Sequence, residues 1–531
     1  MSNLSNQFIR INSKKEVTMR SIFSHFQKSG KMAGLLAFAV MLALTQIAAS
    51  NNIVWLTAGQ GRTNWRSQPL ETNLSPQNVG DLAVKWTNAG GDVSATPSVA
   101  DGVVYYPDWS GNLYAVSADS GEIQWQDNLD ELTGISGAVS RTTPTIDGNV
   151  LYVGLQNQGW LLAISRNKGE LLWMSQLDTH PAAVITQSPA DYNGILFVGM
   201  SSMEESSAID PNYSCCTFRG SLSAVSEKTG EVLWKTYTTP DNGGMPDGYS
   251  GVAVWGSTPV VDPSRKLVYI TTGNNYTVPA DVADGTVPLD STDYVDSILA
   301  LDIRTGHVVW AAPHLGLPSG DAWTVPCIYS VNAPNCPDPA GPDYDFGQGV
   351  MEVSGTIMGT NQTVVIAGQK SGKLWALNAD TGEVVWMYDS GVGGTLGGME
   401  FGSATDGQTV YFANGAGGFW GAVDIATGTP IWQTADPNPL VGPAYVNDTG
   451  PVSVANGVVY VGSMAGNDGT RPSMFALDAG TGQILWQFVS GGSVGGGPAI
   501  VDGVVYWGNG YSHIGFGAPA GTDNFYAFSV K

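Results

Sequence analysis

One motif recurs along almost the whole chain and constrains the fold more than any other feature of the sequence. Residues 376–386 have the sequence ALNADTGEVVW, which combines a short apolar stretch, a polar turn with a glycine, and alternating apolar residues that end in tryptophan. A turn glycine tolerates a positive φ, and alternation with a period of two is typical of strands, so each copy predicts one β-hairpin. The related copies end at Trp125, Trp173, Trp234, Trp310, Trp432 and Trp486.

Repetition of this hairpin predicts how the copies are arranged. A single hairpin cannot bury its own apolar face, so repeated copies must stack on one another. The copies are separated irregularly, by roughly 40–75 residues, which fits the four-stranded antiparallel blades of a β-propeller with loop insertions. In that arrangement the tryptophan at the end of each copy is predicted to pack between adjacent blades.

The two ends of the chain each carry half of a repeat. Residues 51–85 lack the turn half but lead into a strand that contains Trp86, whereas the C-terminal NFYAFSVK matches the strand before the turn and then stops. Joining the halves completes one blade and removes exposed sheet edges. With Trp86 counted, the tryptophans predict an all-β, eight-bladed propeller that occupies residues 51–531 as a single domain and is closed by its N- and C-terminal strands.

The composition agrees with a large globular β protein and excludes one class of partner. The 531 residues are 43% hydrophobic and 13% charged, so the chain can bury a large core. Its formal net charge of −24 argues against a nucleic-acid partner, because neutralising phosphates requires clustered lysines and arginines. The acidity by itself indicates a well-solvated surface.

The N-terminal region has the features of an export signal. Basic residues precede the apolar run at residues 32–44, and small residues follow it at 48–50. This pattern is typical of a secretory signal, so residues 1–50 are predicted to direct the chain to a periplasmic or secreted location. Initiation at Met19 or Met32, and retention of the run as an uncleaved anchor, are the alternatives. No later run is long enough to span a bilayer, which predicts no integral membrane span after signal removal.

The four cysteines are expected to be oxidised after export, and their even number suits two disulfides. The predicted pairs are Cys215 with Cys216 and Cys327 with Cys336. A bond between adjacent cysteines would give a flat, rigid sulfur surface that can support a planar ligand. Two separate partners, or a pair of free thiols, are the alternatives for Cys215 and Cys216.

Oxygen-bearing side chains after two predicted strands indicate a site for a hard cation. Glu204 and Glu205 follow one strand, and Asn274 and Asn275 follow another. Calcium binds carboxylate and amide oxygens of this kind, although surface glutamates and turn asparagines without a metal are the alternative. Zinc is not favoured, because the chain has five histidines and none forms a paired or HExxH arrangement.

The repeats, the eight-blade count, the adjacent cysteines and the run GYSGVAVWGSTPVVDPSRKLVYITTGN together resemble a known family. They are similar to the quinoprotein alcohol dehydrogenases that use pyrroloquinoline quinone (PQQ) and calcium, and the resemblance covers nearly the whole mature chain. The segments SATPSVADGVVYYPDWSGNLYAV, LTGISGAVSRTTPT and CCTFRGS are similar to the polyvinyl-alcohol-dehydrogenase-like branch of that family.

The resemblance implies a role for individual residues of the metal and cofactor sites. Glu204 stands at the calcium-binding glutamate, although a one-residue gap would select Glu205, and Asn274 matches the calcium-binding asparagine. Trp255 matches the aromatic ring that stacks on the quinone, and Lys370 matches the basic residue beside its reactive carbonyl. The other cofactor contacts that the resemblance implies are Arg141, Thr186, Ser202, Cys215 and Cys216.

The catalytic base is implied by the segment DYDFGQGVMEV, which is similar to the family's catalytic segment and selects Asp345. The resemblance also implies that Asp345 is a calcium ligand. An insertion separates this segment from GDAWTVPC, so Asp321 is a rival base. The chain departs from the family at Ser94, where several members have a cofactor-binding glutamate.

The implied function is an exported enzyme that oxidises an alcohol, either a small molecule or a polymer similar to polyvinyl alcohol. Because no CxxCH haem motif occurs in the sequence, electrons are expected to pass to a separate acceptor such as a cytochrome c. The alternative is a non-catalytic propeller that acts as an envelope scaffold, similar to the outer-membrane assembly lipoproteins that share this repeat. Such a lipoprotein needs a cysteine directly after its signal, and none occurs there.

Overall fold

The computed structural model describes residues 53–313, 315, 320–440, 447–512 and 524–531. The predicted signal at residues 1–50 lies outside these residues. Residues 53–531 form one compact unit. In the described part of the chain, no helix is long and apolar enough to cross a membrane.

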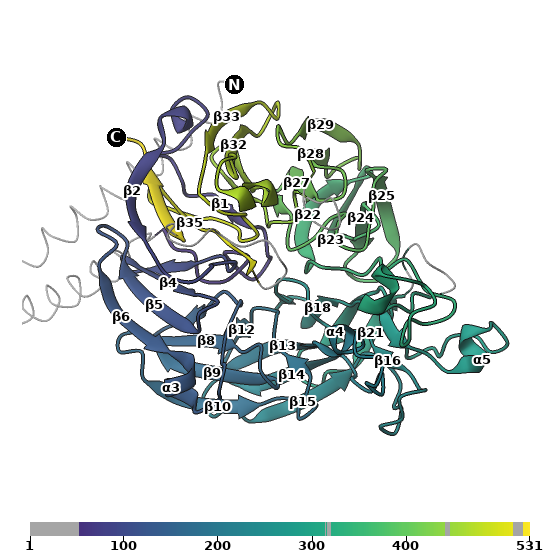
Figure 1. Ribbon diagram of the computed structural model, residues 1–531. Coiled ribbons are helices and arrows are strands. Elements are labelled where there is room, and N and C mark those ends of the chain that lie inside the picture. The colour runs from purple at the N-terminus through teal and green to yellow at the C-terminus, as the bar shows by residue number, and fades with distance from the viewer. Residues whose placement is uncertain (1–52, 314, 316–319, 441–446, 513–523) are drawn as a thin grey trace, which may run out of the picture. The chain divides into compact units, whose positions relative to one another are not determined.

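Eight four-stranded antiparallel sheets follow one another around a ring, which confirms the predicted eight-bladed propeller (Figure 1). The first four blades consist of β3 (Ser98–Ala100), β4 (Val103–Pro107), β5 (Asn112–Ser117) and β6 (Ile123–Asn128); β7 (Thr145–Asp147), β8 (Val150–Gly154), β9 (Trp160–Ser165) and β10 (Leu171–Gln176); β12 (Ala190–Tyr192), β13 (Ile195–Ser202), β14 (Ser221–Ser226) and β15 (Val232–Tyr237); and β17 (Val260–Asp262), β18 (Leu267–Thr271), β20 (Ile298–Asp302) and β21 (Val308–Ala312).

The next three blades follow the same order, and the eighth combines both ends of the chain. They consist of β22 (Met351–Ile357), β23 (Thr360–Gly368), β24 (Lys373–Asn378) and β25 (Val384–Asp389); β26 (Ala404–Thr405), β27 (Thr409–Asn414), β28 (Phe419–Asp424) and β29 (Pro430–Ala435); β30 (Ser453–Ala455), β31 (Val458–Gly462), β32 (Met474–Asp478) and β33 (Ile484–Phe488); and β34 (Ala499–Val501), β35 (Val504–Gly508), β36 (Phe525–Ser529) and β2 (Ala83–Asn88).

Short elements lie outside this scheme and belong mostly to inserted loops. β1 pairs in parallel with β30, β11 pairs with β13, and β16 pairs with β19. These elements and the short helices are β1 (Ser67–Gln68), β11 (Ala183–Val184), β16 (Ser250–Gly251), β19 (Asn275–Thr277), α3 (Leu129–Thr133), α4 (Glu204–Ser207), α5 (Ala280–Ala283), η1 (Val79–Asp81), η2 (Val325–Ile328) and η3 (Met464–Asp468).

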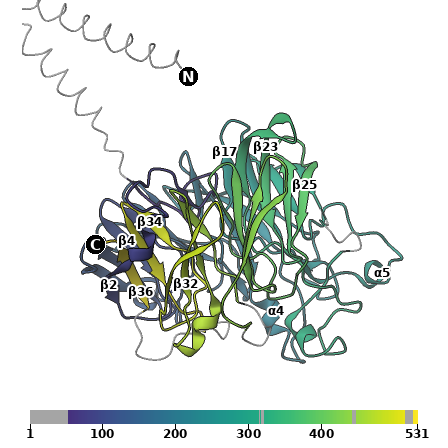
Figure 2. The same cartoon turned by 90° about the horizontal axis from the view of Figure 1, so that it is seen from above.

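The ring is closed by strands from opposite ends of the chain, as the sequence predicts. β2 pairs with β36 in an antiparallel register that matches Ala83 with Ser529 and Asn88 with Phe525. Figure 2 shows these strands, purple and yellow, beside each other. The C-terminal strand lies between β35 and β2, so it is an interior strand of its sheet.

The repeated tryptophans join adjacent blades by one recurring contact. Each indole Nε1 donates a hydrogen bond of 2.9–3.2 Å to a backbone carbonyl of the following repeat. At Trp234 the acceptor is Ile303, and the ring lies against Gly306 in the next TG turn. The interface at Trp486 differs, because its acceptor is Leu82, directly after η1, instead of a residue of a TG turn.

The turn glycines are required both by their backbone and by this packing. Gly306 has φ of +70°, and a Cβ added there would lie 2.4 Å from Cε3 of Trp234. We therefore expect Gly306→Ala to be destabilising through the left-handed backbone and through overpacking, each worth about 1–3 kcal/mol. Gly102, with φ of +76° and nothing within 4 Å of its Cβ position, is the matched control. If urea unfolding gave the same loss of unfolding free energy for Gly306→Ala and Gly102→Ala, the contact with the indole of Trp234 would not limit the size of residue 306.

Candidate active site

A buried lysine forms the centre of the site. Lys370 follows β23, is 7% exposed, and its Nζ lies 2.7 Å from Oδ1 of Asp345 and 3.1 Å from both carboxylate oxygens of Asp343. Burial disfavours the ammonium form, but Asp343 and Asp345 outweigh it, and the pKa of Lys370 is raised well above its ordinary value. Lys370 is therefore held between two acids that favour its charged form.

Asp345 links this lysine to the predicted quinone-stacking ring. Its Oδ2 accepts a 2.6 Å hydrogen bond from Nε1 of Trp255, and Nζ of Lys370 lies 5.3 Å from the centroid of that ring. A Cβ added at Gly273 would lie 2.7 Å from Oδ2 of Asp345, so this close approach needs a glycine in the TGN sequence. The structure thus brings together three residues that the sequence singled out.

Asp321, the rival base, has a different environment. Its Oδ1 accepts a hydrogen bond from the backbone N–H of Asp343 (3.1 Å), and its Oδ2 accepts one from that of Tyr344 (2.6 Å). Burial raises the pKa of Asp321, and these backbone donors partly offset the effect. Both oxygens of Asp321 are used to hold the loop that carries Asp343 and Asp345.

Three further buried acids that the sequence analysis did not select surround this centre. Burial raises the pKa of Asp343 well above its ordinary value despite the nearby Lys370, and it raises that of Glu400 to about 7. Asp296 has two carboxylate oxygens with no hydrogen-bond partner among the described residues, and burial raises its pKa well above the ordinary value. The acids near Lys370 are therefore not fully compensated by it.

The two glutamates of α4 have different surroundings. The carboxylate of Glu204 is completely buried and accepts hydrogen bonds of 2.7–3.0 Å from the backbone N–H groups of Thr217 and Phe218. Burial raises the pKa of Glu205 to about 8, and its charge interacts with those of Lys370 and Asp345. Of the two candidates, Glu205 is the one whose charge is coupled to the centre.

Asn274 is oriented by its amide nitrogen. Nδ2 donates hydrogen bonds of 2.9 Å to the backbone carbonyls of Asn275 and Trp323, and within the described residues no hydrogen bond reaches Oδ1. Asn275 instead donates to Asp293. No group of three His, Cys, Asp or Glu side chains in the described ranges is close enough to hold a metal ion. The oxygen donors near Asp345 still suit a hard cation.

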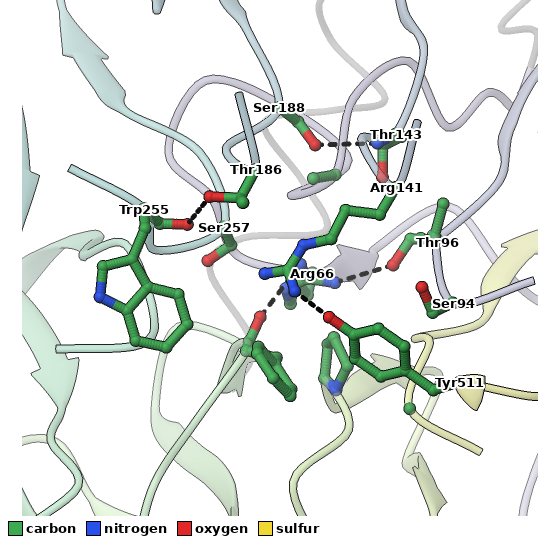
Figure 3. Close-up of a pocket in the computed structure, with 15 residues that line it drawn as sticks. Arg66, Ser94, Thr96, Arg141, Thr143, Thr186, Ser188, Trp255, Ser257 and Tyr511 are labelled. Atoms are coloured by element: carbon green, nitrogen blue, oxygen red, sulfur yellow. Dashed lines mark hydrogen bonds between the residues drawn. The ribbon is translucent and has the colours of Figure 1, made fainter. Parts of the chain in front are cut away.

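A cavity opens beside this centre and has a volume of ≈ 450 Å³ when its opening to solvent is included (Figure 3). Thr186 donates a 3.2 Å hydrogen bond to the backbone carbonyl of Trp255. The guanidinium of Arg141 donates to the hydroxyl of Tyr511 and lies 5.4 Å from the ring centroid of Phe401. The lining residues are Ala58, Arg66, Ser94, Ala95, Thr96, Arg141, Thr143, Thr186, Ser188, Trp255, Ser257, Phe401, Pro451, Gly495 and Tyr511.

Ser202 and the adjacent cysteines do not line this cavity. Ser202 lies at the end of β13, and its hydroxyl donates a 3.3 Å hydrogen bond to that of Tyr276. Cys215 and Cys216 are bonded to each other, as predicted, and Cys215 packs against the apolar cluster that also contacts Trp255. The second predicted disulfide is also present and joins Cys327 to Cys336.

Comparisons with known proteins show which proteins the chain is similar to. A family profile described as outer membrane protein assembly factor BamB matches residues 49–297, 291–466 and 421–521. A polyvinylalcohol dehydrogenase from Pseudomonas sp. is 31% identical over 502 residues, which cover 86% of this chain and 73% of that protein. Another, from Sphingopyxis sp. strain 113P3, is 30% identical over 482 residues, which cover 83% of this chain and 70% of that protein.

Among solved structures, the quinohemoprotein alcohol dehydrogenase from Comamonas testosteroni superposes with a TM-score of 0.69 at 19% identity, covering 92% of this chain and 82% of that one. At this identity the likeness concerns the fold. The class comes from the sequence relatives, which are quinoprotein dehydrogenases that act on alcohols. The chain belongs to the PQQ-dependent alcohol dehydrogenase family, in its polyvinyl-alcohol-dehydrogenase-like branch. It is therefore an oxidoreductase that acts on an alcohol.

Proposed function

We propose that this protein is an exported, PQQ- and calcium-dependent dehydrogenase that oxidises a secondary or polymeric alcohol and passes its electrons to a separate acceptor such as a cytochrome c. The observation that carries the proposal is the contact of Asp345 with both Trp255 and Lys370 at the edge of the cavity. The polyvinylalcohol dehydrogenases named above support the substrate class. A periplasmic or secreted location rests on the predicted signal at residues 1–50.

The site fits an anionic planar cofactor and a hard cation in its chemistry. The cavity offers the indole face of Trp255, the cation of Arg141 and the hydroxyl of Thr186. The residues that would hold calcium are Glu205, Asn274 and Asp345. When bound, the cofactor would supply a two-electron hydride acceptor and calcium would supply a Lewis acid.

The residues of the chain bind, orient and move one proton. Asp345 accepts the proton of the substrate hydroxyl, which is too weak an acid to lose it unaided near neutral pH. Lys370, 2.7 Å from Asp345, balances the acids around it and places a positive charge beside the reacting group. Asp321 fixes the backbone of the loop through the N–H groups of Asp343 and Tyr344, and this keeps Asp345 in position.

The direct test is reconstitution of the purified protein. Wild-type protein given PQQ and calcium should reduce an artificial electron-accepting dye when supplied with a secondary alcohol or with polyvinyl alcohol. Omitting the quinone or chelating the calcium should abolish the reaction. A fully loaded protein that oxidises neither alcohol would overturn the proposed function.

The choice between the two glutamates predicts opposite results for two matched variants. Glu205→Gln removes one of the carboxyl groups proposed to bind calcium, so we expect the calcium concentration needed for half-maximal quinone binding to rise about tenfold or more. Glu204→Gln instead weakens the hydrogen bonds to the amides of Thr217 and Phe218, so thermal stability should fall by about 1.5–3 kcal/mol. Calcium titration and thermal unfolding of both variants distinguish the roles; a calcium effect confined to Glu204→Gln would reverse the assignment.

A further inference from the structure

A second buried cation lies in the cavity wall and, unlike Lys370, has no acidic partner. Arg66 precedes β1, is 2% exposed, and makes no ion pair with any described carboxylate. Its side chain donates one hydrogen bond to the hydroxyl of Thr96 (3.2 Å) and a long one to the carbonyl of Phe401 (3.5 Å), and no described residue forms a hydrogen bond with its Nε. Burial lowers its pKa to about 9. An isolated buried charge of this kind is costly to the fold.

A second arginine reaches the same part of the cavity (Figure 3). Arg141 lies over the ring of Phe401, the residue whose carbonyl accepts from Arg66. Around the two guanidinium groups the wall is formed by neutral hydroxyl groups, such as those of Thr96, Thr143 and Ser188. Two cations among neutral donors form a site that an anion with several acceptor oxygens would complete.

The charges of the site are therefore separated. The buried acids gather around Lys370 beyond Trp255, and the two arginines lie on the cavity side. Glu400 lies between these regions, since its charge interacts with those of both Lys370 and Arg141. A bound molecule whose carboxylates face the arginines would present its other end to Asp345 and Lys370.

We propose that Arg66, together with Arg141, forms a carboxylate-binding end of the cavity that holds and orients the anionic cofactor. The inference rests on the proposed function, because PQQ is the polycarboxylate that the site would receive. It assigns Arg66, which directly precedes β1, to the binding site as a cofactor-binding residue. The isolated charge of Arg66 then lowers the stability of the cofactor-free protein, and it raises the affinity of the protein for the cofactor.

The experiment measures binding directly, by quenching of tryptophan fluorescence in calcium-containing buffer. Arg66→Met keeps the side-chain length and removes the charge, so we expect the dissociation constant for PQQ to rise about 10- to 100-fold. Arg62→Met is the matched control, because Arg62 belongs to the same segment but is exposed and lies over the ring of Tyr192. The control should bind PQQ as the wild type does. Arg66→Lys, which retains the charge, should lose less affinity.

Two further readouts separate cofactor binding from a structural role. The trimethyl ester of PQQ, which lacks the carboxylate charges, should bind more weakly than PQQ to the wild type and with no additional loss to Arg66→Met. The cofactor-free variant should melt at the same temperature as the wild type or higher, whereas a structural arginine would lower the melting temperature. A site for small buffer anions alone would not discriminate the acid from its ester.

The outcomes distinguish this inference from the function on which it rests. If the wild type binds PQQ and Arg66→Met binds it equally well, Arg66 is not a cofactor ligand and only the inference fails. If the wild type and Arg66→Met prefer PQQ over its trimethyl ester by the same factor, the inference also fails. If the wild type itself does not bind PQQ, the proposed function fails first and the inference fails with it.

Discussion

Asp345→Asn is expected to lower the turnover of quinone-loaded enzyme by at least the roughly 10²-fold that is typical of losing a general base. The amide has nearly the same shape and can still accept the hydrogen bond from Nε1 of Trp255, so quinone binding should persist. It cannot take the proton of the alcohol. Stopped-flow reduction of the bound quinone, combined with a separate binding titration, measures the two effects independently.

Two other aspartates serve as controls for this assignment. Asp321→Asn should cost far less turnover but should lower thermal stability, because its two oxygens each accept a backbone N–H of the loop. Asp343→Asn removes the other carboxylate bound to Lys370. A large loss of turnover in Asp343→Asn or Asp321→Asn, with Asp345→Asn unaffected, would move the base to that residue. Normal turnover in all three loaded variants would exclude a carboxylate base.

Deletion of residues 524–531 should prevent the protein from folding to a soluble monomer. The deletion removes β36, which pairs with β35 on one side and β2 on the other, so two edges become exposed inside the ring. It also removes Phe525, which stacks on Tyr106 with ring centroids 3.9 Å apart. We expect aggregation, or loss of a cooperative thermal transition, in size-exclusion and calorimetric measurements.

The control for this truncation is deletion of Lys531 alone, which lies beyond β36 and is exposed. That protein should elute and melt as the full-length chain does. A monomeric product of the longer deletion with an unchanged melting temperature would show that the pairing of β2 with β36 does not hold the ring together.

The ring could be predicted from the sequence because its information is local and repeated. Each TG turn with its tryptophan specifies one hairpin, and the half-repeats at the two ends specify the closure, so no long-range reasoning is needed. The bonded pairs Cys215–Cys216 and Cys327–Cys336 were likewise predicted correctly. What repetition cannot predict is the course of the inserted loops, and these loops carry much of the site.

The candidate site was predictable only where its segments resemble the motifs of the family. Asp345, Lys370 and Trp255 were selected and do meet. Asp343, Asp296 and Arg66 were not, and all three have positive φ, at +59°, +47° and +48°. A strand pattern assumes a regular alternation of side chains, which such a backbone interrupts, so periodicity gives no sign of where these side chains point.

Glu204 and Glu205 show a second limit. They are adjacent in α4, which has four residues, and neighbouring side chains on a helix point in different directions. One of them is hydrogen-bonded to backbone amides, and the charge of the other is coupled to that of Lys370. The spacing of residues in the sequence could not decide which of the two glutamates binds calcium. That choice depends on the residue at which the short helix α4 begins.

The atypical tryptophan contact at Trp486 has a consequence for motion within the ring. Elsewhere the indole is held by a hairpin turn that is part of the next sheet, but here it is held by η1, a single 3-10 turn ahead of β2. Such a turn has few internal hydrogen bonds and can open at lower free energy than a sheet. Native-state hydrogen exchange should therefore find the first subglobal opening at the seam between β33 and β2, with the other blade boundaries exchanging together and later.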